Sequence, residues 1–231
     1  MAKREIKNIP LHVGIIMDGN RRWAKKRLMI ASDGHGAGLD RMIALAEKAK
    51  SMGIKYMTVY ALSTENLQRP EEELSKMFDL IRKNFLNCVD RLVAGGAAFK
   101  VMGDITLLPE DIQKIISDGL ARSPEKAEFT FIMALCYGAR AEIVRAANRA
   151  VERGERVDEQ SFSRLLYTGG VPDPDFIIRP GGELRLSNFL LWQAAYAELY
   201  FTEVLFPDFT DDKFERAIGE YSARTRRFGK V

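Results

Sequence analysis

The chain has 231 residues, a length that suits one sizeable α/β domain and does not require a second. Hydrophobic residues make up 46% of the chain and charged residues 29%, which is the composition of an ordinary water-soluble globular protein. The net charge of +3 argues against a dedicated nucleic-acid-binding protein, because such proteins carry a much larger basic excess.

The sequence also lacks the features of secreted and membrane-spanning proteins. It has no run of about 18 apolar residues, and residues 1–10 form a short polar segment rather than a signal peptide. Cys88 and Cys136 lie far apart and have no CxxC spacing, which fits a reducing compartment. We therefore expect a cytoplasmic protein.

Apolar runs predict six strands, and most of these runs are continuous rather than alternating, as expected for a sheet covered on both faces. Helical spacing of apolar residues occurs between them, and the cationic residues 20–26 are also compatible with a helix. In chain order, the predicted strands are 13–17, 56–62, 99–102, 129–135, 176–178 and 199–205, and the predicted helices are 39–52, 71–93, 141–152 and 214–227. This alternation predicts an α/β fold: a single domain over residues 1–231 with a mostly parallel six-stranded sheet flanked by helices.

The ends of the predicted strands carry most of the chemically informative residues. In a parallel α/β sheet the ligand crevice lies beyond the carboxyl ends of the strands. Several of these ends combine arginine with small or hydroxyl residues, which favours phosphate binding because arginine offers a planar fork of donors to an oxyanion. They include Asp18-Gly19-Asn20-Arg21-Arg22, Ser63-Thr64-Glu65-Asn66 with Arg69 nearby, and residues 179–188 (RPGGELRLSN).

The segment 179–188 is the longest of these. Arg179 and Arg185 flank a Gly-Gly turn, and Ser187 precedes residues 188–198, which are predicted to form a helix. Ser187 is therefore either an ordinary N-cap or part of an anion site built from free helix amides, and the two roles can hold together. The two arginines favour anion binding over a solvated surface pair.

The glycine-rich motif GHGAG at 34–38 leads into a helix predicted to begin near residue 39. Its alternating glycines either allow close backbone approach to a ligand or form a flexible loop. His35 is one of only two histidines. It is either a structural residue or, beside a phosphate, a donor to an oxyanion or an acid that protonates a leaving group.

Two acidic residues are candidate metal ligands. Asp18 follows a predicted strand among cations, and we favour a Mg²⁺-linked role over a structural ion pair, since hard cations are commonly shared between carboxylate and phosphate oxygens. Glu198 lies in a largely apolar stretch, where an unpaired carboxylate would be costly to bury. It requires a partner, which is either a metal ion or an arginine.

Several other site classes are absent from the sequence. It contains no HExxH, GxSxG or GxxxxGK[ST] motif and no GxGxxG after the first strand, which argues against zinc and serine hydrolases, P-loop nucleotidases and dinucleotide sites. What remains is a phosphate or diphosphate site beside the long apolar helix 71–93. Trp23, Met77, Phe78 and Phe85 belong either to an ordinary core or to an apolar tunnel for a hydrocarbon tail.

Taken together, these motifs resemble the cis-prenyltransferases, or isoprenyl transferases, and most of all the bacterial undecaprenyl diphosphate synthases. The resemblance runs in order from about residue 10 to residue 229. It rests on HVGIIMDGNRRWAKK, GHGAG, YALSTENLQRP, RPGGELRLSNFLLWQAAYAELYFTEVLFPDF and the terminal RRFG.

The resemblance implies an enzyme that condenses isopentenyl diphosphate onto an allylic diphosphate, usually farnesyl diphosphate, with Mg²⁺ as cofactor. The product would be a polyprenyl diphosphate carrier lipid for cell-wall precursors, such as undecaprenyl diphosphate, and an apolar tunnel beneath the active site would hold its tail. A homodimer and transient contact with the inner face of the membrane are implied as well. The alternatives are a short- or medium-chain synthase and a non-catalytic partner subunit of a related enzyme.

The resemblance also implies roles for individual residues. Catalytic roles fall on Asp18, Asn20 and Asn66, and metal-ligand roles on Asp18 and Glu198. The residues implied in substrate binding are Gly19, Asn20, Arg21, Arg22, Trp23, His35, Ser63, Thr64, Glu65, Leu67, Arg69, Arg179, Arg185, Leu186 and Ser187.

The chain departs from the family pattern at several positions. Ala31 stands where an arginine usually precedes the loop histidine, and Leu67 stands where a tryptophan is usual. Gly36, Cys136 and Leu184 replace residues that are commonly lysine, asparagine and a polar residue. Losing the arginine removes an expected contact to the diphosphate, so the identity of the allylic primer stays open.

Overall fold

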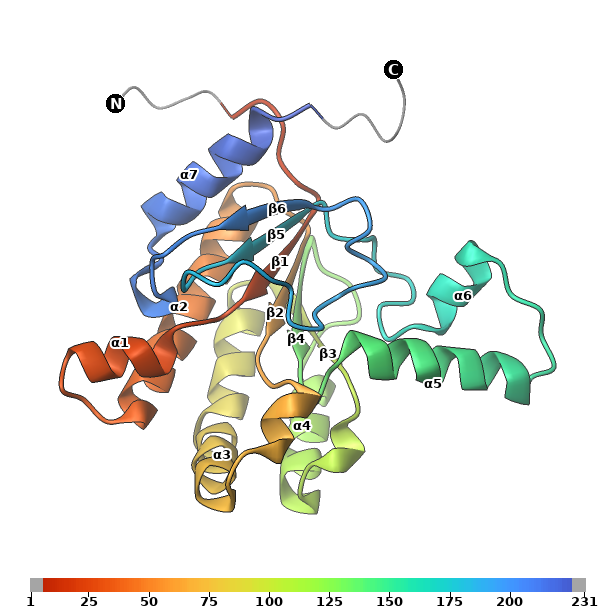
Figure 1. Ribbon diagram of the computed structural model, residues 1–231, viewed down its shortest axis with the longest axis horizontal. Coiled ribbons are helices and arrows are strands. Elements are labelled where there is room, and N and C mark those ends of the chain that lie inside the picture. The colour runs from red at the N-terminus through yellow and green to blue at the C-terminus, as the bar shows by residue number, and fades with distance from the viewer. Residues whose placement is uncertain (1–5, 226–231) are drawn as a thin grey trace.

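A six-stranded, fully parallel sheet forms the centre of the computed structural model, which describes residues 6–225 (Figure 1). The RRFG motif at 226–229 lies outside the described residues. The order β3-β4-β2-β1-β5-β6 and the parallel pairings confirm the predicted α/β fold. The strands are β1 (His12–Ile16), β2 (Tyr56–Tyr60), β3 (Ala97–Met102), β4 (Phe129–Ala134), β5 (Phe176–Arg179) and β6 (Glu198–Phe201).

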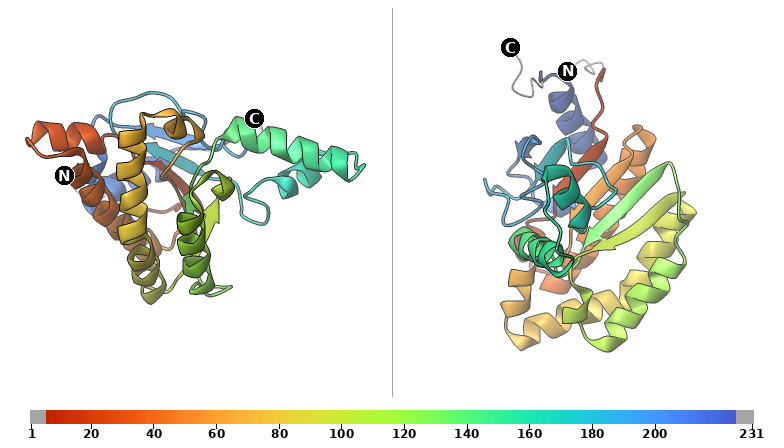
Figure 2. Two further views of the ribbon diagram at one scale, coloured as in Figure 1. Left: turned by 90° about the horizontal axis from the view of Figure 1, so that it is seen from below. Right: turned by 90° about the vertical axis from the view of Figure 1, so that its right-hand side faces the viewer.

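Both faces of the sheet are covered, one by four helices and the other largely by a non-helical segment (Figure 2). One face packs against α2 (Ala31–Ser51), α3 (Glu71–Ala94), α4 (Glu110–Ala121) and α7 (Asp211–Ser222), which bury residues such as Ile43, Phe85, Ile112 and Phe214 against it. The other face is covered by the segment 180–197 and the start of α5 (Ala139–Glu152), which continues with α6 (Glu159–Leu165) into an arm beside the sheet. The remaining elements are α1 (Asn20–Lys26) and the short 3₁₀ helices η1 (Thr64–Gln68), η2 (Ile105–Leu107) and η3 (Phe206–Asp208).

The continuous apolar strands are explained by this arrangement. In β4, Phe131 and Met133 point into the core beneath α2 and α3, while Ile132 and Ala134 belong to the cluster on the opposite face. Because side chains alternate between faces and both faces are buried, every position of the strand except Thr130 is apolar. Among residues 6–225, no helix is both long enough and apolar enough to cross a bilayer.

The predicted helix over 188–198 is wrong. Ser187, Asn188 and Leu190 adopt left-handed backbone angles (φ of 49°, 64° and 48°), so the chain turns repeatedly in this segment. Glu198, the last residue of the predicted helix, begins β6 instead. Phe189 is fully buried and stacks on Tyr60 with ring centroids 4.8 Å apart. The helical spacing of apolar residues was real, but packing under the sheet face decided the conformation, as tertiary contacts often do.

The start predicted for the helix near residue 39 is also wrong, because α2 begins at Ala31 and includes the GHGAG motif. Glycine is a poor helix former, so propensity pointed to a loop. Helices α4 and α6 are further elements that the sequence analysis did not identify.

A buried histidine links three parts of the sheet at its amino edge. His12 is 1% exposed; its Nδ1 donates to the carbonyl of Pro172 (2.7 Å), so Nε2 accepts from the Thr58 hydroxyl (2.8 Å). Burial lowers the pKa of His12 to about 4, against the opposing effects of Pro172 and Asp175. The folded protein therefore requires the neutral imidazole.

We expect the free energy of unfolding to fall as the pH drops from about 6.5 to about 4, by on the order of 3 kcal/mol from His12. The unfolded chain takes up a proton throughout this range, whereas folded His12 resists protonation until the lower limit. Urea unfolding across this range measures the effect, and His12→Asn should flatten it. An NMR titration in which the ring of His12 protonates near its ordinary value would contradict the prediction.

Candidate active site

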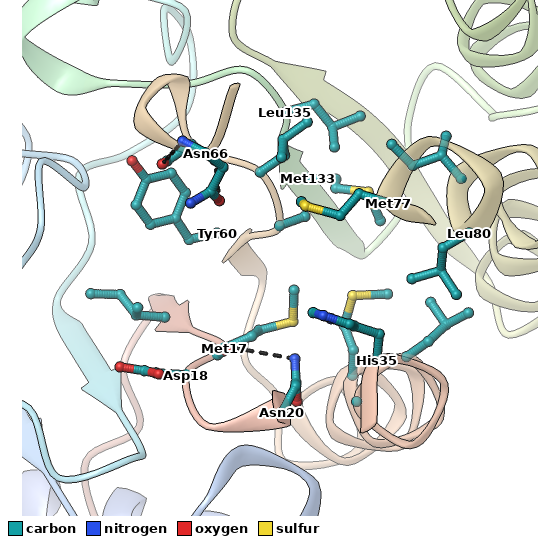
Figure 3. A pocket seen from close by; sticks show the side chains of 18 of the residues that line it. Met17, Asp18, Asn20, His35, Tyr60, Asn66, Met77, Leu80, Met133 and Leu135 are labelled. Carbon is teal, nitrogen blue, oxygen red and sulfur yellow. Dashed lines mark hydrogen bonds between the residues drawn. The ribbon is translucent and has the colours of Figure 1, made fainter. Parts of the chain in front are cut away.

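A cavity of about 750 Å³ opens beyond the carboxyl ends of the central strands (Figure 3). One part of its wall is polar and comes from the strand ends, and the other part is apolar and comes mainly from α2, α3 and β4. The structure brings ten of the polar and charged residues singled out from the sequence to this wall, and of the candidate tunnel residues it adds Met77 and Phe85. The ten are Asp18, Asn20, His35, Ser63, Glu65, Asn66, Arg69, Arg179, Arg185 and Ser187. Its apolar part includes Met17, Leu39, Met42, Met77, Leu80, Ile81, Phe85, Met133 and Leu135.

Asp18 lies between two guanidinium groups. One carboxylate oxygen accepts from Arg22 Nη2 (3.0 Å) and the other from Arg179 Nη2 (2.9 Å). The turn after β1 is possible because Gly19 adopts a left-handed φ of 103°, and an added Cβ there would lie 2.9 Å from a methyl of Leu205. The site thus combines one carboxylate with cations, as an anionic ligand with a bridging metal ion would require.

Arg179 is buried, at 5% exposure, and holds the loop after β5 against Asp18. Its Nη1 donates to the carbonyl of Arg185 and to the Ser187 hydroxyl (2.7 Å), while Nη2 reaches Asp18. The side chain of Arg185 is 61% exposed and pairs with Glu183 at 2.6 Å. Of the two predicted anion-binding arginines, Arg185 has the freedom to reach a ligand, whereas Arg179 is engaged in positioning its neighbours.

The glycines of GHGAG serve helix packing. A Cβ on Gly34 would lie 2.2 Å from the backbone oxygen of Asn20, and a Cβ on Gly38 would lie 2.6 Å from its Oδ1. The two glycines are one turn apart on α2 and so face α1 together. The glycine motif is therefore not a flexible loop: Gly34 and Gly38 allow α2 to approach Asn20 closely.

Asn20 itself has an unsatisfied atom. Its Oδ1 is buried without a hydrogen-bond partner, and its Nδ2 makes a long contact of 3.5 Å to the carbonyl of Met17 (Figure 3). Buried polar atoms are rarely left unpaired in native structures, and exceptions commonly mark functional sites. Asn20 Oδ1 is thus buried in the contact between α1 and α2, against Gly38, while the residue itself contributes to the cavity wall.

His35 projects into the cavity from the first half of α2 (Figure 3). Burial lowers its pKa, and the nearby cations Arg69 and Arg21 lower it further, against the opposing effect of Glu73. A neutral imidazole is therefore the form present at neutral pH, and it offers one donor and one acceptor to a ligand.

The segment after β2 is organised by local hydrogen bonds. The Ser63 hydroxyl accepts from the backbone N–H of Asn66 (3.1 Å), and Asn66 Oδ1 accepts from the N–H of Ser63 (3.1 Å). This reciprocal capping begins η1 and places both side chains at the cavity. Arg69 and Arg21 both donate to Glu73 Oε1, at 2.9 and 2.7 Å, which holds these cations near the mouth.

The remaining predicted residues do not line the cavity. Trp23 donates from its ring nitrogen to Asp208 (2.8 Å), and the predicted substrate contact Leu67 packs against the core instead. The others outside the cavity wall are Gly19, Arg21, Arg22, Thr64, Leu186 and Glu198. Of these, Arg22 still reaches the site through its ion pair with Asp18.

Glu198 is separated from Asp18 within the chain. It opens β6 opposite Phe176, at the amino edge of the sheet, whereas Arg179 pairs with Phe201 at the other end of the same strands. Its carboxylate accepts from Arg224 (2.8 Å), so the arginine is the partner that this structure gives it. Among residues 6–225 no cluster of three or more His, Cys, Asp or Glu side chains is placed to hold a metal ion. Within one copy of the chain, the two predicted metal ligands, Asp18 and Glu198, therefore do not meet at one site.

The residues around Asp18 nevertheless fit one kind of Mg²⁺ site, in which the substrate supplies part of the ligands. Mg²⁺ commonly binds through one or two carboxylates and completes its shell with substrate phosphates and water. Asp18 supplies one carboxylate to the cavity wall, where Asn20 lies beside it with its Oδ1 buried against Gly38. A metal ion shared with a phosphate ligand suits these residues, whereas a metal site built from protein side chains alone does not.

Asn188 is a site residue that the sequence analysis did not single out. Its Nδ2 donates to Glu65 Oε1 (2.8 Å), its Oδ1 accepts from the N–H of Arg140 (2.9 Å), and its carbonyl accepts from the N–H of Ala139 (2.9 Å). It therefore ties together the segments that follow β2, β4 and β5. Asparagine tolerates left-handed backbone angles better than most residues. An asparagine at the end of the arginine-rich segment 179–188 was therefore the sequence feature that could have indicated a turn at this position.

Comparisons with known proteins agree with this geometry. Residues 16–229 match the family described as "Putative undecaprenyl diphosphate synthase". The isoprenyl transferase of Fusobacterium nucleatum is 46% identical over 226 residues, which cover 97% of this chain and 98% of that protein. The chain superimposes on lavandulyl diphosphate synthase from Lavandula x intermedia, solved with dimethylallyl diphosphate, with a TM-score of 0.90 at 38% identity, covering 96% and 99% of the two chains. A probable undecaprenyl diphosphate synthase from Campylobacter jejuni gives a TM-score of 0.84 at 32% identity, covering 96% and 100%.

The packing role of the glycines can be tested with a matched pair of substitutions in α2. Gly38→Ala should lower the free energy of unfolding by about 1–3 kcal/mol and displace Asn20, because the new methyl would overlap its amide. Gly36→Ala is the control: nothing lies within 4 Å of a Cβ there, so it should raise stability by about 0.5–1 kcal/mol. Equal effects of the two substitutions in urea unfolding would show that the glycines do not act through contact with Asn20.

Substitution of Asn188 separates backbone strain from side-chain hydrogen bonding. Asn188→Ala should cost about 2–3 kcal/mol of unfolding free energy, because it removes two hydrogen bonds and leaves a Cβ in a left-handed conformation. Asn188→Gly removes the same hydrogen bonds without the strain, so its cost should be smaller by about 1 kcal/mol. If the glycine variant were the less stable of the two, the strain argument would fail.

Proposed function

The chain belongs to the undecaprenyl diphosphate synthase family of cis-prenyltransferases and is a prenyl-transferring enzyme; from this premise we propose that it condenses isopentenyl diphosphate onto farnesyl diphosphate to make a long polyprenyl diphosphate such as undecaprenyl diphosphate. One observation carries the proposal: a single cavity joins cationic and carboxylate groups at strand ends to an apolar space between α2, α3 and β4. A prenyl diphosphate has the same two parts, a charged head and a hydrocarbon tail. The dimethylallyl diphosphate in the lavandulyl diphosphate synthase structure supports an allylic diphosphate as one substrate.

In this proposal the polar wall stabilises a leaving diphosphate. Breaking the allylic C–O bond develops negative charge on the diphosphate, and groups that bind this charge more strongly in the transition state accelerate the step. Arg185 and the amide of Asn20 are the donors in our assignment, while Arg22 and Arg179 hold Asp18 in place. Asn66 and His35 line the same cavity as further hydrogen-bonding groups.

Mg²⁺ would be held by the carboxylate of Asp18. When bound, it would neutralise part of the charge on the substrate diphosphate. The residues of the chain orient the two substrates, so that the isopentenyl double bond attacks the allylic carbon as its C–O bond breaks; a new C–C bond forms and a proton is lost. Glu198 remains a predicted metal ligand, for which this structure provides no partner other than Arg224.

The apolar wall is assigned to the growing hydrocarbon tail. Met17, Met77 and Met133 project toward one another across the cavity, with Leu80 and Leu135 beside them (Figure 3). Such walls exclude water, which would otherwise react with an allylic cation. Because product length depends on how much tail the cavity accepts, the undecaprenyl product and the farnesyl primer are the finer part of the proposal.

A short-chain cis-prenyl diphosphate synthase is the second candidate. It is favoured by the similarity to lavandulyl diphosphate synthase, which superimposes on this chain with a TM-score of 0.90. The probable undecaprenyl diphosphate synthase gives a lower TM-score of 0.84. A homodimer, a cytoplasmic location and a role in supplying carrier lipid for cell-wall precursors complete the proposal, by analogy with the family.

The assay that tests the proposal combines the pure protein with radiolabelled isopentenyl diphosphate, farnesyl diphosphate and Mg²⁺. We expect chain-extended product, whose length by mass spectrometry separates the long-chain from the short-chain candidate. Asp18→Asn should lower kcat/KM by about 100-fold or more, because it disrupts the charge arrangement at the diphosphate.

Asp79→Asn is the matched control for this substitution. Asp79 is a half-exposed carboxylate on α3 that pairs with Arg82 away from the cavity, so its replacement should leave activity within about twofold. Absence of extended product with farnesyl, geranyl and dimethylallyl diphosphate alike would overturn the proposed function.

A further inference from the structure

The turn between α1 and α2 exposes a run of apolar side chains at one end of the molecule. Leu28, Met29 and Ile30 are 98%, 42% and 69% exposed, and every residue from Lys25 to Asp33 is exposed. Figure 1 and the left view of Figure 2 show this turn projecting on the side opposite the α5–α6 arm. Consecutive exposed apolar residues are unfavourable in water, so such a run indicates a partner surface.

The turn is an ordered structure rather than a loose loop. The backbone N–H groups of Leu28 and Met29 donate to the carbonyls of Lys25 (3.2 Å) and Ala24 (3.0 Å), and the N–H of Ile30 donates to the Asp33 carboxylate (3.3 Å). Leu28 adopts a left-handed φ of 56°, which is uncommon for leucine and directs the chain around the tip. The apolar side chains are therefore presented in a defined arrangement.

The base of the turn is fixed to the body of the protein. The Arg27 guanidinium lies 4.1 Å from the ring centroid of Trp23 and pairs with Asp208 at 3.1 Å, and the same carboxylate accepts from the Trp23 ring nitrogen. Trp23, which had been expected at the substrate, thus supports the turn. The tip is therefore held in a fixed position relative to the body of the protein.

Cations flank the apolar tip. Lys25 and Lys26 occupy the last turn of α1 and are exposed, and a shallow hollow beside them adds Lys213 and also Arg41, which pairs with Asp211 at 3.2 Å. Asp208 and Glu203 also border this hollow, but Asp208 is occupied by Arg27. An apolar tip with cations behind it is the arrangement that inserts between lipid headgroups while lysines remain at the anionic surface.

The tip is connected to the cavity through helix α2. The turn leads directly into α2, whose residues His35 and Leu39 line the cavity wall. A bilayer in contact with residues 28–30 would therefore touch the chain only a few residues before the part of α2 that lines the cavity.

We propose that the tip formed by Leu28, Met29 and Ile30, with Lys25 and Lys26 behind it, is a docking element for an anionic lipid bilayer. The inference goes beyond prenyl transfer and stands on exposure, order and charge at this turn; only its use in passing product to the membrane rests on the proposed function.

The test is co-sedimentation of the full chain with vesicles. We expect binding to phosphatidylcholine vesicles that contain about one-third phosphatidylglycerol and much weaker binding to phosphatidylcholine alone, with salt reducing the difference. The triple variant Leu28→Ser, Met29→Ser, Ile30→Ser should lower the vesicle partition constant at least about tenfold, because little apolar surface is left to insert. Lys25→Gln with Lys26→Gln should lower it by about fivefold for each cation.

Val144→Ser with Val151→Ser is the matched control, since these valines are 59% and 78% exposed on α5 at the other end of the molecule. It should bind vesicles like the unsubstituted protein. All variants should keep their melting temperature and their turnover of soluble substrates, so loss of vesicle binding is distinguishable from failure of the proposed function.

Two outcomes would overturn the inference. One is a triple variant that binds anionic vesicles as tightly as the unsubstituted chain. The other is a change in molar mass by light scattering in the triple variant, with no vesicle binding by the unsubstituted chain, which would make the tip a contact between copies of the protein.

Discussion

Arg179, at the end of β5, is a buried guanidinium whose partners come from two separate parts of the site. A buried cation is costly unless it is paired and hydrogen-bonded. Asp18 and the loop at 185–187 supply acceptors for both terminal nitrogens of Arg179, whereas its Nε is buried without a partner. Because β1 and β5 are neighbours in the sheet, one side chain spans from the end of one strand to the loop after the other. The location of Asp18 relative to that loop depends on this contact.

The cavity has two chemical characters because two kinds of element build it. Strand ends supply the charged and amide groups, while the helices α2 and α3 supply apolar side chains from the faces that they turn toward the sheet. Several of these side chains are methionines, whose unbranched, flexible thioethers adapt to ligands of different shape. A wall of this kind suits a hydrocarbon tail that lengthens during a reaction better than a rigid pocket would.

Glycines 34 and 38 and the left-handed Asn188 show how closely the backbone is involved in the site. The glycines let α2 approach Asn20, and Asn188 joins the segments after β2, β4 and β5 through its side chain and carbonyl. None of these contacts requires a ligand. The polar wall is therefore preorganised by the packing of the protein itself, which is the condition under which fixed dipoles and charges assist a reaction most.

The sequence by itself determined the α/β class, the approximate positions of the strands and ten residues of the cavity wall. These follow from local rules: apolar runs covered on both faces form parallel strands, and the carboxyl ends of parallel strands meet at one edge. Only the tertiary structure decided that residues 188–198 turn rather than form a helix, that GHGAG is helical, and that Glu198 pairs with Arg224 far from Asp18. In each case the deciding contact joins residues distant in the chain, such as Phe189 with Tyr60 and Gly38 with Asn20, and periodicity and propensity carry no information about such contacts.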